Sequence, residues 1–316
     1  SDVETRLQSA SGGAFKAMIN ALGSDIITFG AEWQTRSKVV HSWSYAENAY
    51  KRFTGSKYVQ SQVGQSFANC KRFLESGRGV LFTGTPCQIA GLKSYLGKTY
   101  PRLICVDIVC HGVPCSKTLE RYLQCKEKRI ARRISAICFR RKQFFDYKWN
   151  SKCIETWFED GCSVIENSER DPYMRGFSYG LFFRPSCSDC PYATIERGSD
   201  ITIGDAWGIE RTYPEINVHE GVSLLLANTP QGLALIKELN NYMVLEDISI
   251  DTLKFGNARL RKPDKGHDKR QQFFSLQDRV DFEKLVYRCV PETQFLRRIG
   301  HKVKCKLISL KSDQKR

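Results

Sequence analysis

Two stretches decide the fold: GVLFTGTPC at residues 79–87 and LICVDIVCHG at residues 103–112. Each is a short apolar run of strand length that ends at a break containing glycine or proline. Apolar residues at helical spacing follow over residues 87–96, and a second helix is expected over residues 116–129. This repeated strand–loop–helix order predicts an α/β fold with a mixed, partly parallel sheet and flanking helices.

The same two stretches place Cys87 and Cys110 at matching positions, each just beyond its strand. Ligands of parallel sheets bind beyond the carboxyl ends of the strands, so we expect the cofactor site there, with both thiols at one edge. Cys87 also follows Pro86 at the start of a helix, where free N–H groups and the helix dipole stabilise a thiolate. The alternative for each cysteine is a small, buried apolar residue.

A second pair, Cys187 and Cys190, lies in RPSCSDCP at residues 184–191, with proline on both sides. The prolines favour a rigid turn that directs both sulfurs toward one centre. Together with Cys87 and Cys110, the pair offers four thiolates to a [4Fe–4S] cluster, which would imply electron transfer. A structural zinc site and unused thiols are the alternatives that the residues leave open.

Three loops of small residues suggest a pocket for a large cofactor. They are Ser11-Gly12-Gly13 before an expected helix at residues 14–22, Gly84-Thr85-Pro86, and GDAWG at residues 204–208. Glycines let the backbone approach an anion, and the N–H groups of a following helix receive it. Trp207 can stack on a ring system or fill the core. His111 can hydrogen-bond to a cluster, relay a proton, or serve only its own turn.

The other segments are predicted from the same patterns. A hairpin is expected around Asp160-Gly161. Residues 259–272 are polar and are expected to form a surface loop. Further strands are expected at residues 26–31, 38–43, 134–139, 152–159, 162–166, 199–203 and 222–227, and helices at residues 171–183, 231–240 and within 282–310.

Composition limits the class of protein. The chain has 316 residues, 13 cysteines and a net charge of +15. It contains neither an apolar run near the ~20 residues that span a membrane nor a signal-peptide layout at its start, so we expect no transmembrane segment and a cytoplasmic protein with reduced thiols. The oligomeric state is open, and an oligomer is compatible with the sequence.

The positive charge indicates either acidic partners or a solvated tail. Because no nucleic-acid-binding module accompanies it, we expect no nucleic acid partner. The charge concentrates near the C-terminus, at Arg297, Arg298, Lys302, Lys304, Lys306, Lys311, Lys315 and Arg316.

These motifs, with GSKYVQS at residues 55–61 and DITIGDAWG at residues 200–208, resemble the beta-subunit family of coenzyme F420-reducing hydrogenases and F420-linked dehydrogenases. The resemblance covers about residues 9–210 in the family's order. It implies an iron–sulfur flavoprotein oxidoreductase that passes electrons between a [4Fe–4S] cluster and an organic acceptor through FAD. In archaeal members the acceptor is a deazaflavin coenzyme.

The resemblance also implies roles for individual residues. Cys87, Cys110, Cys187 and Cys190 would be the cluster ligands. Lys57 and His111 would be the catalytic residues, with Lys57 balancing negative charge on a phosphate or on the reduced flavin ring. The FAD site would comprise Ser11, Gly12, Gly13, Lys57, Tyr58, Thr83, Gly84 and Thr85, with Asp205 and Trp207 from the third small-residue loop.

One departure from the family concerns electron supply. Many members carry an N-terminal ferredoxin-type module, whereas the first cysteine here is Cys70. We therefore expect a separate ferredoxin or ferredoxin domain as donor, unless the sequence begins late in a longer protein. Residues 1–255 would form the FAD and iron–sulfur domain, and residues 256–316 a basic, partly helical extension. The rival hypotheses are a zinc-stabilised binding protein and a degenerate, non-catalytic partner subunit.

Overall fold

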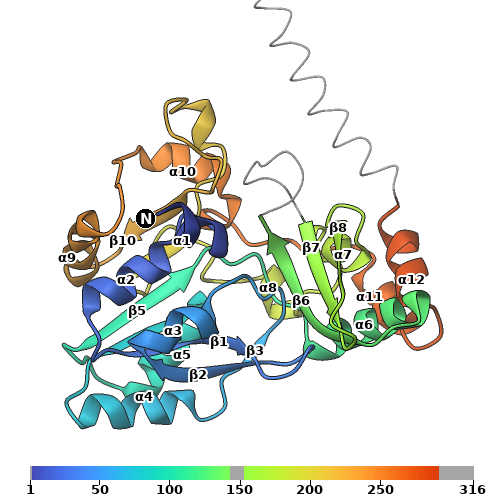
Figure 1. Ribbon diagram of the computed structural model, residues 1–316, viewed down its shortest axis with the longest axis horizontal. Coiled ribbons are helices and arrows are strands. Elements are labelled where there is room, and N and C mark those ends of the chain that lie inside the picture. The colour runs from blue at the N-terminus through green and yellow to red at the C-terminus, as the bar shows by residue number, and fades with distance from the viewer. Residues whose placement is uncertain (1, 143–152, 292–316) are drawn as a thin grey trace, which may run out of the picture.

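Seven strands form the main sheet of this computed structural model, which describes residues 2–142 and 153–291 (Figure 1). In spatial order the strands are β10 (Ser223–Ala227), β9 (Ile201–Asp205), β5 (Leu103–Ile108), β4 (Val80–Gly84), β1 (Ile27–Trp33), β2 (Val39–Tyr45) and β3 (Ser61–Gln62). The four central strands, β9, β5, β4 and β1, are mutually parallel. Antiparallel β10 and β2 flank them, and short β3 runs parallel to β2. The α/β prediction, with its mixed and partly parallel sheet, is confirmed.

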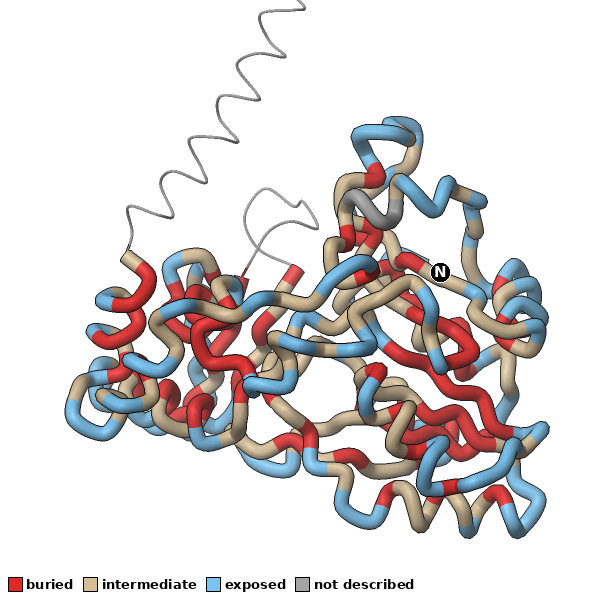
Figure 2. Tube along the Cα trace, turned by 180° about the vertical axis from the view of Figure 1, so that it is seen from behind, coloured by how far each residue is buried: buried red, intermediate tan, exposed pale blue. Residues whose placement is uncertain are grey.

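Helices cover both faces of this sheet because its central strands alternate between two cores. In β4, Val80 and Phe82 pack with α4 (Ser66–Glu75) and α5 (Pro86–Leu96). Leu81 points the other way, into a core shared with the helices α2, α3 and α9. These three helices span Ala14–Leu22, Ala46–Phe53 and Pro230–Glu238. Figure 2 shows the buried strands running through the middle of this layer.

A second, three-stranded antiparallel sheet stands beside the first. It consists of β6 (Ile134–Arg141), β7 (Cys153–Phe158) and β8 (Ser163–Asn167). Its core is rich in stacked and tilted aromatic rings, among them Phe139, Tyr173 and Phe182. The helices that complete it are α6 (Ser116–Ile130), α7 (Pro172–Ser178), α11 (Arg270–Leu276) and α12 (Phe282–Cys289).

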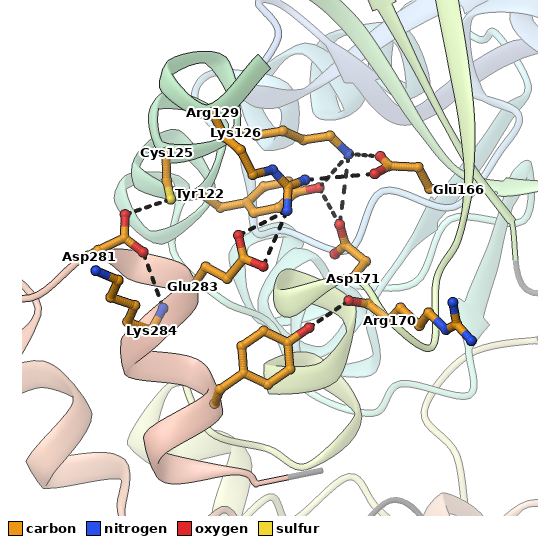
Figure 3. Close-up of polar contacts among 11 residues, drawn as sticks. Tyr122, Cys125, Lys126, Arg129, Glu166, Arg170, Asp171, Asp281, Glu283 and Lys284 are labelled. Atoms are coloured by element: carbon orange, nitrogen blue, oxygen red, sulfur yellow. Dashed lines mark hydrogen bonds and ion pairs between the residues drawn. The ribbon is translucent and has the colours of Figure 1, made fainter. Parts of the chain in front are cut away.

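A network of charged side chains holds these helices together (Figure 3). The Lys126 ammonium of α6 pairs with Glu166 of β8 and lies 3.9 Å from Asp171, which also accepts a hydrogen bond from the Tyr122 hydroxyl. Asp171 caps α7, and its pKa is raised, mainly by burial. Arg129 reaches Glu283 of α12 at 3.0 Å. Buried Lys126 and Asp171 thus connect α6 to α7, and the partly exposed pair of Arg129 and Glu283 connects α6 to α12.

The remaining described elements are short. They are α1 (Val3–Gln8), α8 (Pro185–Ser188), α10 (Ile250–Gly256) and three 3₁₀ turns at Ile209–Arg211, Leu239–Asn241 and Ala258–Leu260. Across the described ranges, no helix is long and apolar enough to cross a bilayer.

Three predictions about elements need correction. The helix expected over residues 171–183 is wrong in length: α7 ends at Ser178, because Gly180 adopts a left-handed φ of +66° that terminates the turn. The loop expected over residues 259–272 contains the start of α11. Of the region at 282–310, α12 is helical, while residues 292–310 and the basic residues from Arg297 onward lie outside the described part. The domain boundary at residue 255 stays a prediction.

Candidate functional site

Four thiols converge at the carboxyl edge of the main sheet. Gly84 of β4 lies opposite Asp107 of β5, and Cys87 and Cys110 each follow three residues later. Burial raises the pKa of Cys110 to about 12, and Cys87, Cys187 and Cys190 act in the same direction through their charge, so all four cysteines lie in one region. Within residues 2–142 and 153–291, no three acidic, histidine or cysteine side chains are close enough to share a single metal ion.

Two backbone amides point at these sulfurs. The Gly112 amide hydrogen-bonds to Cys110 and the Val113 amide to Cys187, and each bond lowers the thiol's pKa against the larger effect of burial. Gly112 has a φ of +123°, and a Cβ there would lie 2.6 Å from the Phe183 ring. Glycine is therefore required for this loop to approach the segment that carries Cys187.

Cys87 is exposed at the first turn of α5. Its sulfur lies 3.1 Å from the Thr85 hydroxyl, and the Thr85 amide donates to Gln88 Oε1 at 2.9 Å. The Gln88 amide nitrogen donates in turn to Ser61 Oγ at 2.9 Å. Gln88 thus fixes the Thr85–Cys87 turn to a neighbouring strand, and a Cβ at Gly84 would lie only 3.2 Å from the same Oε1.

His41 also helps to hold the Thr85–Cys87 turn, and the sequence did not predict this role. Its Nδ1 is 2.9 Å from Ser61 Oγ and its Nε2 is 2.7 Å from the Thr83 carbonyl oxygen. Burial lowers the pKa of His41, so the ring is neutral and donates from Nε2 to Thr83. The only sequence signal was a histidine in an alternating strand. The Thr83 hydroxyl, a predicted flavin contact, donates to the Phe29 carbonyl at 2.8 Å.

The predicted phosphate loop lies at the neighbouring strand end. The Ser11 hydroxyl donates to the Val222 carbonyl at 2.8 Å, and the Gly12 amide donates to Ser223 Oγ at 2.9 Å. Ser223 pairs with Asp205 at the end of β9. Gly13 begins α2 with a φ of +90°. The structure therefore brings Ser11, Gly12 and Gly13 beside Asp205.

Arg140 of β6, which sequence reasoning also missed, joins three of the predicted residues. Its Nη1 lies 2.6 Å from Asp205 Oδ2, and its guanidinium lies over the Trp207 ring at 5.5 Å. The Tyr58 hydroxyl hydrogen-bonds to the same guanidinium, while burial raises the pKa of Tyr58. This grouping of Tyr58, Arg140, Asp205 and Trp207 is a cluster across both sheets.

The two predicted catalytic residues lie on different loops, Lys57 after α3 and His111 after β5. The Lys57 ammonium donates to the carbonyls of Phe53 at 3.0 Å and Thr54 at 2.8 Å, with Gly55 at 3.3 Å, so it caps the end of α3. Burial lowers its pKa to about 8. His111 reaches solvent, yet the protein packed around it removes enough water to lower its pKa, and the positive charge of Arg259 adds to this effect.

Comparisons with known proteins give a matching family and a solved structure of similar fold. The family described as the C terminus of the coenzyme F420 hydrogenase/dehydrogenase beta subunit matches residues 77–252. No curated protein sequence matches. A chain from the F420-reducing [NiFe] hydrogenase complex of Methanosarcina barkeri is similar in fold, with a TM-score of 0.50 and 15% sequence identity over 88% of this chain and 89% of that chain. That likeness shows the fold.

Proposed function

The chain belongs to the coenzyme F420 hydrogenase/dehydrogenase beta-subunit family, and from that premise we propose that it is an iron–sulfur flavoprotein oxidoreductase. In this proposal a [4Fe–4S] cluster and FAD, when bound, would supply one-electron transfer and hydride transfer respectively. A ferredoxin or ferredoxin domain would be the electron donor, and an organic molecule, such as a deazaflavin, would be the acceptor.

The convergence of four thiols carries the proposal. A [4Fe–4S] cluster takes one cysteine thiolate at each of its four irons. Cys87, Cys110, Cys187 and Cys190 supply four thiols from loops in one region beyond the strand ends. The amides of Gly112 and Val113 supply the hydrogen bonds to sulfur that tune such clusters.

The proposed FAD site extends from the thiols to the loop at Ser11–Gly13. The Gly13 backbone and the first N–H groups of α2 would receive the phosphates, since the Gly12 amide already donates to Ser223 Oγ. Tyr58, Asp205 and Trp207 would line the ring system together with Thr83, Gly84 and Thr85. Lys57 would act there only through its positive charge, because its three N–H donors already bind backbone carbonyls at the end of α3. His111 would hold or move a proton at the solvent-facing edge.

The test is an anaerobic preparation assayed for iron, zinc, sulfide, released flavin and visible absorption. We expect about four irons and one FAD per chain, with a broad brown absorption. Cys187→Ser should lose iron and absorption, whereas Cys162→Ser, at an exposed thiol of the β7–β8 hairpin, should keep both.

Other results would favour the rival hypotheses. Zinc without iron or flavin, even after anaerobic reconstitution, would replace the proposal with a zinc-stabilised binding protein. A cluster without flavin would indicate a non-catalytic partner subunit.

A further inference from the structure

One basic segment runs along several loops of the site. Residues 256–270 extend from α10, over the main sheet, to α11, beside the second sheet (Figure 1). At the start of this segment, a Cβ on Gly256 would overlap the Trp207 carbonyl, and the Asn257 amide group donates to the Asp205 carbonyl at 3.1 Å. We call residues 256–270 the cationic segment.

The middle and end of the cationic segment lie on the thiol loops. A Cβ on Gly266 would lie 2.7 Å from the hydroxyl of Ser188, which stands between Cys187 and Cys190. The charges of Arg259 and Asp264 act on His111, next to Cys110. At its end, Arg270 Nε donates to the Phe183 carbonyl at 2.7 Å. The segment therefore forms part of the rim of the thiol site.

The charge on this rim is strongly unbalanced. The cationic segment contains six basic residues and two acidic ones. Arg259 is paired with Asp264 at 3.2 Å, and Asp268 Oδ1 accepts a hydrogen bond from the Lys269 amide at 2.9 Å. Arg261, Lys262 and Lys265 lie toward solvent and form no ion pair with any described residue. Exposed Arg184 adds a further positive charge beside Cys187.

Resting on the function proposed above, we propose that the cationic segment is the docking surface for a small acidic electron-carrier protein. Exposed, unpaired charges at a rim steer an oppositely charged partner and raise its association rate. Cys87 is an exposed residue and Cys110, Cys187 and Cys190 are partly exposed, so the loops that carry the thiols lie near enough to the surface for such a partner to approach them.

The exposure of these charges favours a protein over a small anion. Sites for small ligands bury most of the ligand among a few converging polar groups. Arg261, Lys262 and Lys265 instead face solvent along a segment that spans three loops, which suits a broad carboxylate-bearing surface.

The test is the binding of a purified acidic ferredoxin, measured by calorimetry at about 50 and about 500 mM salt. The rim variant is Arg261→Glu/Lys262→Glu/Lys265→Glu. The control variant is Lys51→Glu/Lys128→Glu/Lys237→Glu, which makes the same charge change at exposed lysines of α3, α6 and α9. Iron content and circular dichroism are measured on every sample.

We expect the wild-type protein to bind the ferredoxin and to lose affinity at high salt, because screening weakens exposed charge pairs. The rim variant should bind about tenfold more weakly, or weaker still, at low salt, and the control variant within about threefold of wild type. Equal losses in both variants, or no binding by wild-type protein that contains iron, would overturn the docking surface alone. Binding by wild-type protein without iron would instead leave the docking surface standing and remove the proposed function. Binding of pyrophosphate without binding of ferredoxin would indicate a small-anion site and overturn the proposal.

Discussion

At the scale of single residues, Lys142 has the most constrained environment next to the proposed flavin site. Its ammonium donates to the carbonyls of Arg6, Ser11 and Glu220, the longest of these contacts being 2.8 Å. It thereby ties the Ser11–Gly13 loop to the loop before β10. Burial, together with the positive charge of Arg140 and Arg6, lowers the pKa of Lys142 to about 7, although Asp205 and Glu220 act in the opposite direction.

This pKa predicts a pH dependence of stability. An unfolded lysine titrates near ~10.4, so between pH ~7 and that value the unfolded chain binds more protons than the folded one, and the free energy of unfolding rises with pH. From pH ~7 to ~8, Lys142 should contribute about 1 kcal/mol to that rise. Histidines, unfolded thiols and Lys57, whose pKa is about 8, also titrate in or near this window, but the wild type and a Lys142 variant share them. The contribution of Lys142 is therefore the difference between the two proteins.

Urea unfolding of Lys142→Met across the same pH window checks this. Between pH ~7 and ~8 the free energy of unfolding should rise by about 1 kcal/mol less in the variant than in the wild type, whereas Lys128→Met, at an exposed lysine of α6, should keep the wild-type slope. A Lys142→Met protein with the wild-type slope would show that Lys142 keeps an ordinary pKa in the folded state.

At the scale of elements, the end of α6 carries a correctable strain. Its C-cap, Ala131, has a φ of +55°, and it is the sole non-glycine residue with positive φ among those described. Glycine adopts this conformation without the Cβ clash, so Ala131→Gly should raise the free energy of unfolding by about 0.5–1 kcal/mol. Ala234→Gly, at an exposed position inside α9, should lower it by a similar amount. Thermal unfolding of both variants measures these changes. A loss of stability in both would show that Ala131 is not strained by its positive φ.

The central elements could be predicted from sequence because their signals are local. The runs at β4 and β5, with the glycine and proline breaks after them, specify strand, turn and helix without reference to the rest of the chain. The end of α7 was missed, since Gly180 inside an apolar stretch gives no sign of its left-handed conformation until Asp264 and Gly266 pack against it. Contacts between residues far apart in the chain leave no periodic pattern in the sequence.

At the scale of the whole molecule, the candidate site is where the two sheets meet. The cysteines Cys87 and Cys110 and the small-residue loops follow the ends of strands, so their place in the site could be predicted from the sequence. The role of Arg140 could not be predicted in this way. Arg140 lies on the second sheet and contacts Asp205 on the first, and the two residues are 65 positions apart in the chain. The same holds for the cationic segment, whose charges looked like an ordinary surface loop.

The Arg140–Asp205 pair should therefore couple the two sheets energetically. Both side chains are largely buried, at 17% and 15% exposed, so removing either partner leaves a poorly solvated charge. We expect Arg140→Met and Asp205→Asn each to lower the free energy of unfolding by about 2 kcal/mol, and the double variant to lose about 1–2 kcal/mol less than their sum. The matched control is the exposed Arg132–Asp160 pair, which lies within the second sheet and its turns. The coupling energy of this pair should stay below about 1 kcal/mol. Double-mutant cycles from urea unfolding measure both pairs. Equal coupling in the two cycles would mean that Arg140 and Asp205 interact as ordinary surface charges and that other contacts hold the sheets together.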